Sequence, residues 1–122
     1  MFSYFTGDWT YLHSDKEAAG KSAFGERIAH GYMTLSVSLG LMVRSGVIDP
    51  AVFRALKSIE YVRFIGPVKI GDTLTVFYSS KREASRRGTV CVKTDAHTIN
   101  QRNETVMEFG TTHLEKAPAE IR

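Results

Sequence analysis

Three scarcities narrow the class of protein before any motif is considered. The chain has one cysteine, Cys91, which excludes a disulfide within the chain. No basic segment followed by an apolar one opens the sequence, and no uninterrupted apolar run reaches the roughly 18 residues that a membrane-spanning helix needs. With an ordinary 43% of hydrophobic residues, the sequence predicts a soluble protein that is not associated with a membrane, and a cytoplasmic location.

Charge of either sign is also modest. The formal net charge is +3, and the basic residues are dispersed apart from Lys81-Arg82 and Arg86-Arg87, which flank a predicted turn. Nucleic-acid binding would need a denser basic stripe with interleaved aromatic residues, so nucleic acid is not expected as a partner. Two interpretations of the basic turn stay open. We favour a solvated loop over a patch that binds the phosphates of a cofactor.

The length of 122 residues predicts a single domain, residues 1–122. The segment from Ser14 to Glu17 fits a capping box, in which the Ser14 hydroxyl and the Glu17 carboxylate satisfy free amides at the start of a short helix that fails near Gly20. From His30 to Arg44 the apolar residues leave no wide polar face. Leu35, Val37, Leu39 and Leu41 alternate with small residues, which also fits a strand, so periodicity alone does not decide between the two. The length of the segment and its Arg44-Ser45-Gly46 ending favour a long helix, buried on all sides.

From Ser58 onward the chain is rich in β-branched and aromatic residues, which predicts strands. The connections between the strands are short and carry turn residues, so we expect an antiparallel meander. A central helix wrapped by strands defines an α+β fold. The four predicted strands lie in SIEYVRFIG, TLTVFYSSKREA, GTVCVKTDAHTIN and ETVMEFGTTHLEK.

An acid and an imidazole, Asp8 and His13, stand close together in TGDWTYLHSD near the start of the chain. If both hold one water, they can remove its proton and return a proton elsewhere, which is the general acid-base work of adding water to a double bond. The spacing alone favours the plainer alternative, in which Asp8 accepts local amides and His13 is an ordinary half-buried side chain. The 4 histidines show no tight ligand spacing, so no metal is expected.

A second candidate site lies where the long helix is predicted to begin, in the sequence Ile28-Ala29-His30-Gly31. Helix N-termini present unpaired amides and the positive end of the helix dipole, so the Gly31 amide could donate to an oxyanion. The alternative is that these residues form only the junction between loop and helix.

Taken together, TGDWTYLHSD, FGERIAHGYMTLS and VRFIGPVKIGDTL resemble the MaoC-like dehydratase family, which includes the R-specific enoyl-CoA hydratases. The resemblance runs in order over nearly the whole chain. It implies a hotdog fold, a long central helix wrapped by a curved antiparallel β-sheet, in a homodimer or higher homo-oligomer. It also implies reversible addition of water to a trans-2-enoyl thioester of coenzyme A or acyl carrier protein, giving the (R)-3-hydroxyacyl thioester. No cofactor is implied beyond the coenzyme A of the substrate itself.

The resemblance also implies roles for individual residues. Asp8 and His13 match the catalytic pair that holds the attacking water, and Gly31 matches the glycine whose backbone amide binds the thioester oxygen. The candidates for substrate binding are Thr10, Tyr11, His30 and Arg63, with Lys69 as a further candidate for cofactor contact.

This chain departs from the family pattern in three places. Thr10-Tyr11 replaces the Asn-Pro or Gln-Pro of many relatives, which predicts a reshaped pocket, and Leu39 stands where R-specific hydratases often have a serine before the helix glycine. Only residues 1–5 precede the first motif, where relatives usually have a strand and a longer helical approach. We therefore expect a fragment or a fold that dispenses with that strand.

Two other functions stay open at this point. A hotdog thioesterase often places an acid on the central helix, and residues 32–43 contain none. A non-catalytic acyl-thioester-binding or regulatory subunit is also possible for this fold, because a fold can persist without its chemistry. Retention of both Asp8 and His13 argues against that second alternative.

Overall fold

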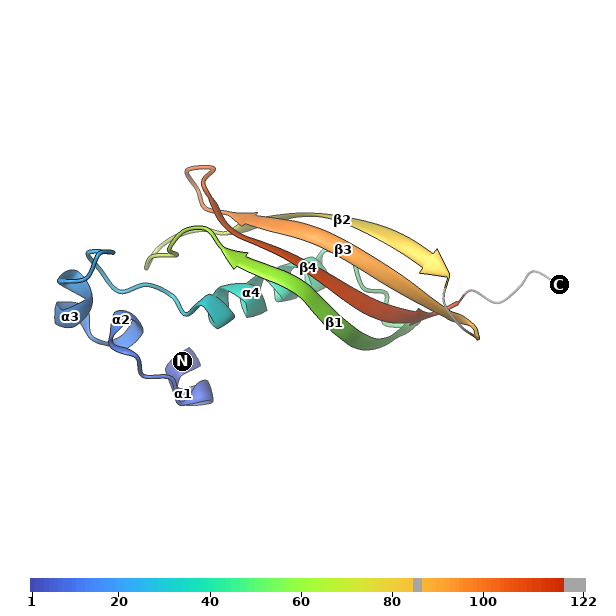
Figure 1. Cartoon of the computed structure of the whole chain (residues 1–122), viewed down its shortest axis with the longest axis horizontal. Coiled ribbons are helices and arrows are strands. Elements are labelled where there is room, and N and C mark those ends of the chain that lie inside the picture. The colour runs from blue at the N-terminus through green and yellow to red at the C-terminus, as the bar shows by residue number, and fades with distance from the viewer. Residues whose placement is uncertain (85–86, 118–122) are drawn as a thin grey trace.

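The structure, a computed structural model, describes residues 1–84 and 87–117. Arg86 of the predicted basic turn lies outside the described residues. Over these residues the chain forms three short helices, then one long helix and then four strands (Figure 1). The elements are α1 (Phe2–Thr6), α2 (Tyr11–Ser14), α3 (Lys16–Gly20), α4 (Gly31–Arg44), β1 (Phe53–Phe64), β2 (Thr75–Ala84), β3 (Thr89–Ile99) and β4 (Thr105–Lys116).

The four strands form one antiparallel sheet in the order β1-β4-β3-β2. Strands β2, β3 and β4 make the predicted meander, but β1 pairs with β4 and not with β2. The prediction of a meander was therefore wrong for β1, because residues 65–74 cross from one edge of the sheet to the other instead of forming a hairpin. The register of β1 against β4 shifts at three places. Such bulges bend a strand and increase its twist, which suits the curvature of the sheet.

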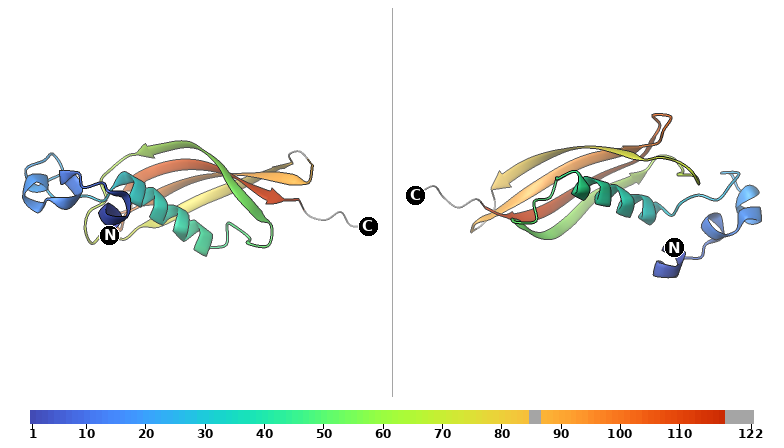
Figure 2. Two further views of the ribbon diagram at one scale, coloured as in Figure 1. Left: turned by 90° about the horizontal axis from the view of Figure 1, so that it is seen from below. Right: turned by 180° about the vertical axis from the view of Figure 1, so that it is seen from behind.

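Helix α4 lies along the curved sheet, which wraps over one side of it (Figure 2). The buried residues Thr34, Ser38 and Met42 follow one another at intervals of one turn and form the stripe that faces the sheet. On the other side, Tyr32 is 71% exposed and Val43 is 48% exposed. The helix and the curved sheet are confirmed, whereas burial of the helix on all sides is wrong for a single copy of the chain.

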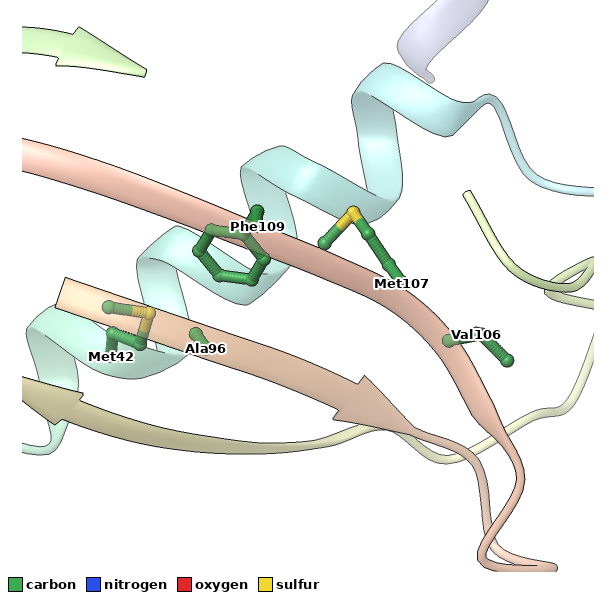
Figure 3. Packing of buried hydrophobic residues seen from close by; sticks show 5 residues of the cluster. All are labelled: Met42, Ala96, Val106, Met107 and Phe109. Atoms are coloured by element: carbon green, nitrogen blue, oxygen red, sulfur yellow. The ribbon is translucent and has the colours of Figure 1, made fainter. Parts of the chain in front are cut away.

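The hydrophobic core fills the space between α4 and the sheet (Figure 3). Between helix and sheet, the Ser38 hydroxyl and the Thr98 hydroxyl lie 2.8 Å apart and are both fully buried. A small residue on the helix thus allows β3 to come close while its own polar atom stays satisfied. The core cluster consists of Met42, Ala96, Val106, Met107 and Phe109.

The start of α3 differs from the predicted capping box. The cap is Asp15, whose Oδ1 accepts from the amides of Glu17 at 3.0 Å and Ala18 at 3.1 Å. Ser14 is instead the last residue of α2. Its hydroxyl donates to the backbone carbonyls of Trp9 and Thr10, which precede that helix. The predicted end of the helix near Gly20 is confirmed.

A buried polar cluster lies on the face of the sheet that α4 covers, toward the end of β4. The Glu115 carboxylate is fully buried and accepts from Arg82 Nη1 and from His113 Nε2, the latter at 2.9 Å. Arg82 therefore neutralises a buried acid. This argues against the interpretation that Arg82, as part of the basic turn, binds the phosphates of a cofactor.

None of the helices in the described residues is long and apolar enough to span a membrane.

Candidate active site

Asp8 directly follows α1, at a turn that the preceding glycine makes possible. Gly7 ends the helix in the left-handed conformation with φ of 78°, which a residue with a side chain adopts only at a cost. Asp8 Oδ1 then accepts two hydrogen bonds from Thr10, from the hydroxyl at 2.6 Å and from the backbone amide at 3.0 Å. These bonds lower the pKa of Asp8 below its ordinary value, because they favour the ionised form. Because both bonds go to Oδ1, the second carboxylate oxygen, Oδ2, stays available to accept a hydrogen bond from another group.

His13 is held on α2 by a hydrogen bond to the backbone. Its Nδ1 lies 2.8 Å from the carbonyl oxygen of Ile28, and that segment is itself fixed by the amide of Ala29, which donates to the carbonyl of Val68 at 2.8 Å. A carbonyl oxygen can only accept, so Nδ1 carries the proton. In the neutral ring, Nε2 then keeps its lone pair and can accept a proton.

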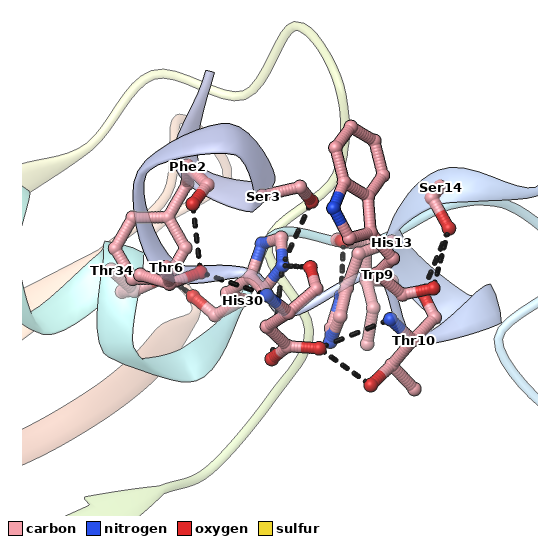
Figure 4. Close-up of polar contacts among 11 residues, drawn as sticks. Phe2, Ser3, Thr6, Trp9, Thr10, His13, Ser14, His30 and Thr34 are labelled. Carbon is pink, nitrogen blue, oxygen red and sulfur yellow. Dashed lines mark hydrogen bonds and ion pairs between the residues drawn. The ribbon is translucent and has the colours of Figure 1, made fainter.

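His30 contacts both Asp8 and His13 (Figure 4). It is only 6% exposed, and its ring stacks on the ring of His13 with a centroid distance of 4.0 Å and an angle of 25°. Its Nε2 lies 3.0 Å from the carbonyl oxygen of Asp8 and 3.8 Å from Asp8 Oδ2. Residues that are far apart along the chain thus form one compact polar cluster.

Asp8, His13 and His30 each offer one ligand atom, and these atoms lie within 4.8 Å of one another. The spacing in the sequence concealed this cluster, because His30 comes from the start of α4. A tetrahedral metal needs lone pairs that converge on one point. His13 Nδ1 and His30 Nε2 each lie within hydrogen-bond distance of a backbone carbonyl oxygen, so both nitrogens carry protons and offer no lone pair to a metal. This geometry suits hydrogen bonds to a water better than coordination of a metal.

Gly31 is the first residue of α4, and its N–H is one of the amides that have no carbonyl partner within the helix. A Cβ at Gly31 would lie 2.9 Å from Cε1 of Phe64, so a larger residue here would displace that ring. His13 and Gly31 both line a cavity of about 360 Å³. Its other walls are mostly apolar and include Phe24, Ile28, Phe64, Pro67, Val68 and Val106. The cavity can therefore take an apolar chain beside the His13 ring.

The structure places the remaining predicted residues in different surroundings. Thr10 donates two hydrogen bonds to Asp8, and the exposed Tyr11 does not line the cavity that His13 and Gly31 border. Arg63 lies on the face of the sheet away from α4, 3.5 Å from Glu108 and with its guanidinium 4.4 Å from the centre of the Tyr61 ring. The structure therefore does not bring Arg63 to the Asp8–His13 pair.

A second cavity of about 340 Å³ borders His13 and His30. It is lined by Ser3, His13, His30, Arg27 and Lys69 among others, and Lys69 Nζ lies 3.6 Å from Glu26 Oε2. Sequence reasoning missed Ser3, for which the motifs carried no signal. It also missed the cavity residue Phe24, although Phe24 is the first residue of FGERIAHGYMTLS. Phe64, Pro67 and Val68 could have been predicted as cavity residues, since they belong to the motif VRFIGPVKIGDTL.

A long helix wrapped by a curved antiparallel sheet, with an acid and an imidazole before the helix N-terminus, defines a protein of the hotdog class. The sequence matches the MaoC like domain over residues 1–102, and the chain belongs to this family. Among solved structures, the monoamine oxidase regulatory protein of Archaeoglobus fulgidus is 31% identical with a TM-score of 0.91, covering 97% of this chain and 79% of that one. An R-hydratase of Pseudomonas aeruginosa is 25% identical with a TM-score of 0.72, covering 99% of this chain and 76% of that one.

Two curated relatives with similar sequences are both longer than this chain. Protein MaoC of Klebsiella aerogenes is 46% identical over 82 residues, which are 67% of this chain and 24% of that protein. The 3-hydroxyacyl-thioester dehydratase Z of Mycobacterium tuberculosis is 34% identical over 72 residues, 59% of this chain and 48% of that protein. The chain thus spans about a quarter of one relative and about half of the other.

Proposed function

We propose that this protein is an acyl-thioester hydratase or dehydratase that adds water reversibly to a trans-2-enoyl thioester and forms the (R)-3-hydroxyacyl thioester. The observation that carries the proposal is a pair of acceptors in one side-chain cluster, Asp8 Oδ2 and His13 Nε2, which the hydrogen bonds to Thr10 and Ile28 leave available. Of these two residues, His13 lines the apolar cavity that Gly31 also borders. The R-hydratase and the dehydratase among its relatives support the same reaction class.

In the hydration direction, Asp8 and His13 accept hydrogen bonds from one water and turn its oxygen toward the β-carbon of the enoyl group. As the new C–O bond forms, one proton of the water passes to the pair, which acts as the general base. The apolar cavity receives the acyl chain and excludes other water from the double bond.

Attack at the β-carbon moves an electron pair toward the thioester oxygen and creates an enolate. The Gly31 amide at the start of α4 donates to this oxygen, and the positive end of the helix dipole stabilises its charge. The proton held by the pair then passes to the α-carbon, which completes the addition of one water. The reverse sequence of the same steps gives dehydration.

Two other functions have less support. Helix α4 carries no acidic residue, which argues against a thioesterase of the kind that uses an acid on the central helix. A non-catalytic acyl-thioester-binding subunit is the second candidate, favoured by one observation: the solved relative with a TM-score of 0.91 is called a regulatory protein. The intact arrangement of Asp8, Thr10 and His13 favours catalysis over that alternative.

Hydration of enoyl thioesters is the direct test of this proposal. We expect the protein, after dialysis against EDTA, to consume trans-2-enoyl-CoA substrates, measured as loss of the conjugated enoyl absorbance. Chiral chromatography of the product should show the R enantiomer. A series of acyl lengths and the corresponding acyl-carrier-protein substrates would define the substrate range. Binding of acyl thioesters without turnover across the whole series would support the regulatory alternative instead.

We further propose that a second copy of this chain covers the exposed side of α4 in a homodimer or higher homo-oligomer. Apolar and aromatic side chains are left exposed there, including Tyr32, Val37 and Val43. Exposed apolar surface of this kind is common at interfaces between protein chains. Light scattering coupled to gel filtration should give at least twice the mass of one chain, 13.6 kDa. A monomeric mass at assay concentration would overturn this proposal.

A further inference from the structure

The His30 side chain makes contacts that the proposed hydration step does not itself use. Its ring stacks on His13 at 4.0 Å, and its Nε2 lies 3.0 Å from the backbone carbonyl of Asp8. One buried side chain therefore touches both members of the catalytic pair, while its own exposed fraction is only 6%. His30 also immediately precedes Gly31, whose amide is the proposed oxyanion donor.

The direction of the hydrogen bond follows from the chemistry of its partner. The Asp8 carbonyl only accepts, so His30 Nε2 carries a proton and donates it. The Ser3 hydroxyl lies 3.3 Å from the same nitrogen, and the Phe2 ring lies 4.7 Å from the imidazole centroid. Both residues belong to α1, so the first helix of the chain encloses His30 against the catalytic pair (Figure 4).

We propose that His30 is a positioning residue for the catalytic pair and not the substrate contact that the sequence suggested. The Nε2–H of His30 holds the backbone of Asp8, and its ring supports the face of the His13 imidazole. Together these contacts keep Asp8 Oδ2 and His13 Nε2 aimed at one water. The proposal rests on the hydratase function proposed above.

The expected loss of activity on removal of His30 depends on how accurately the catalytic groups must be oriented. A displacement of about 1 Å in a catalytic group can cost on the order of 100-fold in rate, although the displaced residue never touches the reacting atoms. His30 acts through the pair, so its loss should lower kcat and leave substrate affinity nearly unchanged. A substrate contact would raise KM instead.

Two substitutions separate the contacts that His30 makes. His30→Phe keeps an aromatic ring to stack on His13 and removes the donor to Asp8. His30→Gln keeps a side-chain N–H and removes the ring. We expect His30→Phe to lower kcat about 10- to 100-fold with KM changed less than about twofold, and His30→Gln to recover most of that loss because the directional hydrogen bond is restored. The matched control is His97→Phe, which changes an exposed histidine that stacks on Phe77 on the face of the sheet away from α4.

A double-mutant cycle tests whether His30 acts through Asp8. In the Asp8→Asn background, His30→Phe should cost little further activity, since there is no carboxylate left to position. Fully additive losses, a raised KM with unchanged kcat, or an unchanged kcat would each overturn the positioning role. Absence of turnover in the wild-type protein would instead remove the proposed function itself, and the positioning role with it.

One measurement does not depend on activity or on the stability of a variant. Long-range ¹⁵N–¹H NMR of the wild-type protein should show His30 in the Nε2–H tautomer and His13 in the Nδ1–H tautomer, as their carbonyl partners require. A His30 ring protonated on Nδ1 alone would mean that the bond to Asp8 is absent, and the proposal would fall. Urea unfolding of both His30 variants identifies any loss of kcat that comes from global unfolding, and a loss explained wholly by unfolding would contradict the proposal.

Discussion

Asp8→Asn and His13→Asn should each lower kcat for enoyl-thioester hydration by about 10²- to 10⁴-fold, the range for loss of a general acid or base. Asparagine at position 8 can still accept from Thr10 but has lost the ionised oxygen. Asparagine at position 13 can still donate to the carbonyl of Ile28 but has no counterpart of Nε2. Each variant therefore removes the chemistry while it keeps the local hydrogen bond.

The double variant tells whether the two groups share one water. If they do, it should be little slower than the slower single variant, because residues that work as a unit give losses that do not add. Losses that add fully in free energy would indicate two independent roles and would contradict the shared-water mechanism. Asp95→Asn is the matched control, since Asp95 accepts from the Tyr61 hydroxyl at 2.7 Å on the face of the sheet away from α4 and should leave kcat unchanged.

The elements of this fold could be predicted because their signals are local. Runs of β-branched and aromatic residues marked the strands, and the apolar segment after His30 marked α4. The pairing of β1 with β4 could not be predicted, because a crossover and a hairpin leave the same strand pattern in the sequence. Burial of α4 on all sides was inferred from its apolar pattern. That pattern shows that several faces of the helix are apolar, but it does not show which faces are covered within a single copy of the chain.

The candidate site was predicted where one short segment supplies the groups. Asp8, Thr10 and His13 lie on neighbouring turns, so their approach follows from spacing. The contact between His30 and Asp8 joins residues 22 positions apart and depends on how the N-terminal segment folds back on the start of α4. Arg63 follows Val62 on β1, and side chains alternate between the faces of a strand. Val62 packs on the core, so Arg63 faces away from α4.

Glu115 is a buried acid that no motif indicated, because a glutamate near the end of a strand is usually exposed. Its burial would by itself raise its pKa, but the hydrogen bonds from His113 and Arg82 outweigh that effect, and the pKa lies below its ordinary value of 4.5. The carboxylate is therefore ionised in the folded protein at neutral pH. The network joins β2 to the end of β4 across the sheet.

Glu115→Ala should lower the free energy of unfolding by about 2 to 3 kcal/mol at neutral pH. This is less than the loss of roughly 3 to 5 kcal/mol for breaking a wholly buried ion pair, because the Arg82 side chain is 59% exposed and keeps some hydration. Urea unfolding followed by circular dichroism measures the difference. The control Glu83→Gln removes an exposed ion pair with Lys93 at 3.4 Å and should cost about 1 kcal/mol or less.

The same comparison has a pH dependence whose sign is fixed by the lowered pKa of Glu115. Folding keeps the carboxylate ionised at pH values where the unfolded chain has begun to bind a proton, so the stabilisation is fully present above the unfolded pKa near 4.5. It is lost as the pH falls through the lower, folded pKa. The difference in unfolding free energy between wild type and Glu115→Ala should therefore be constant around neutral pH and shrink below pH 4.5. A difference that stays constant, or grows, on acidification would show that the carboxylate contributes through packing and not through its charge.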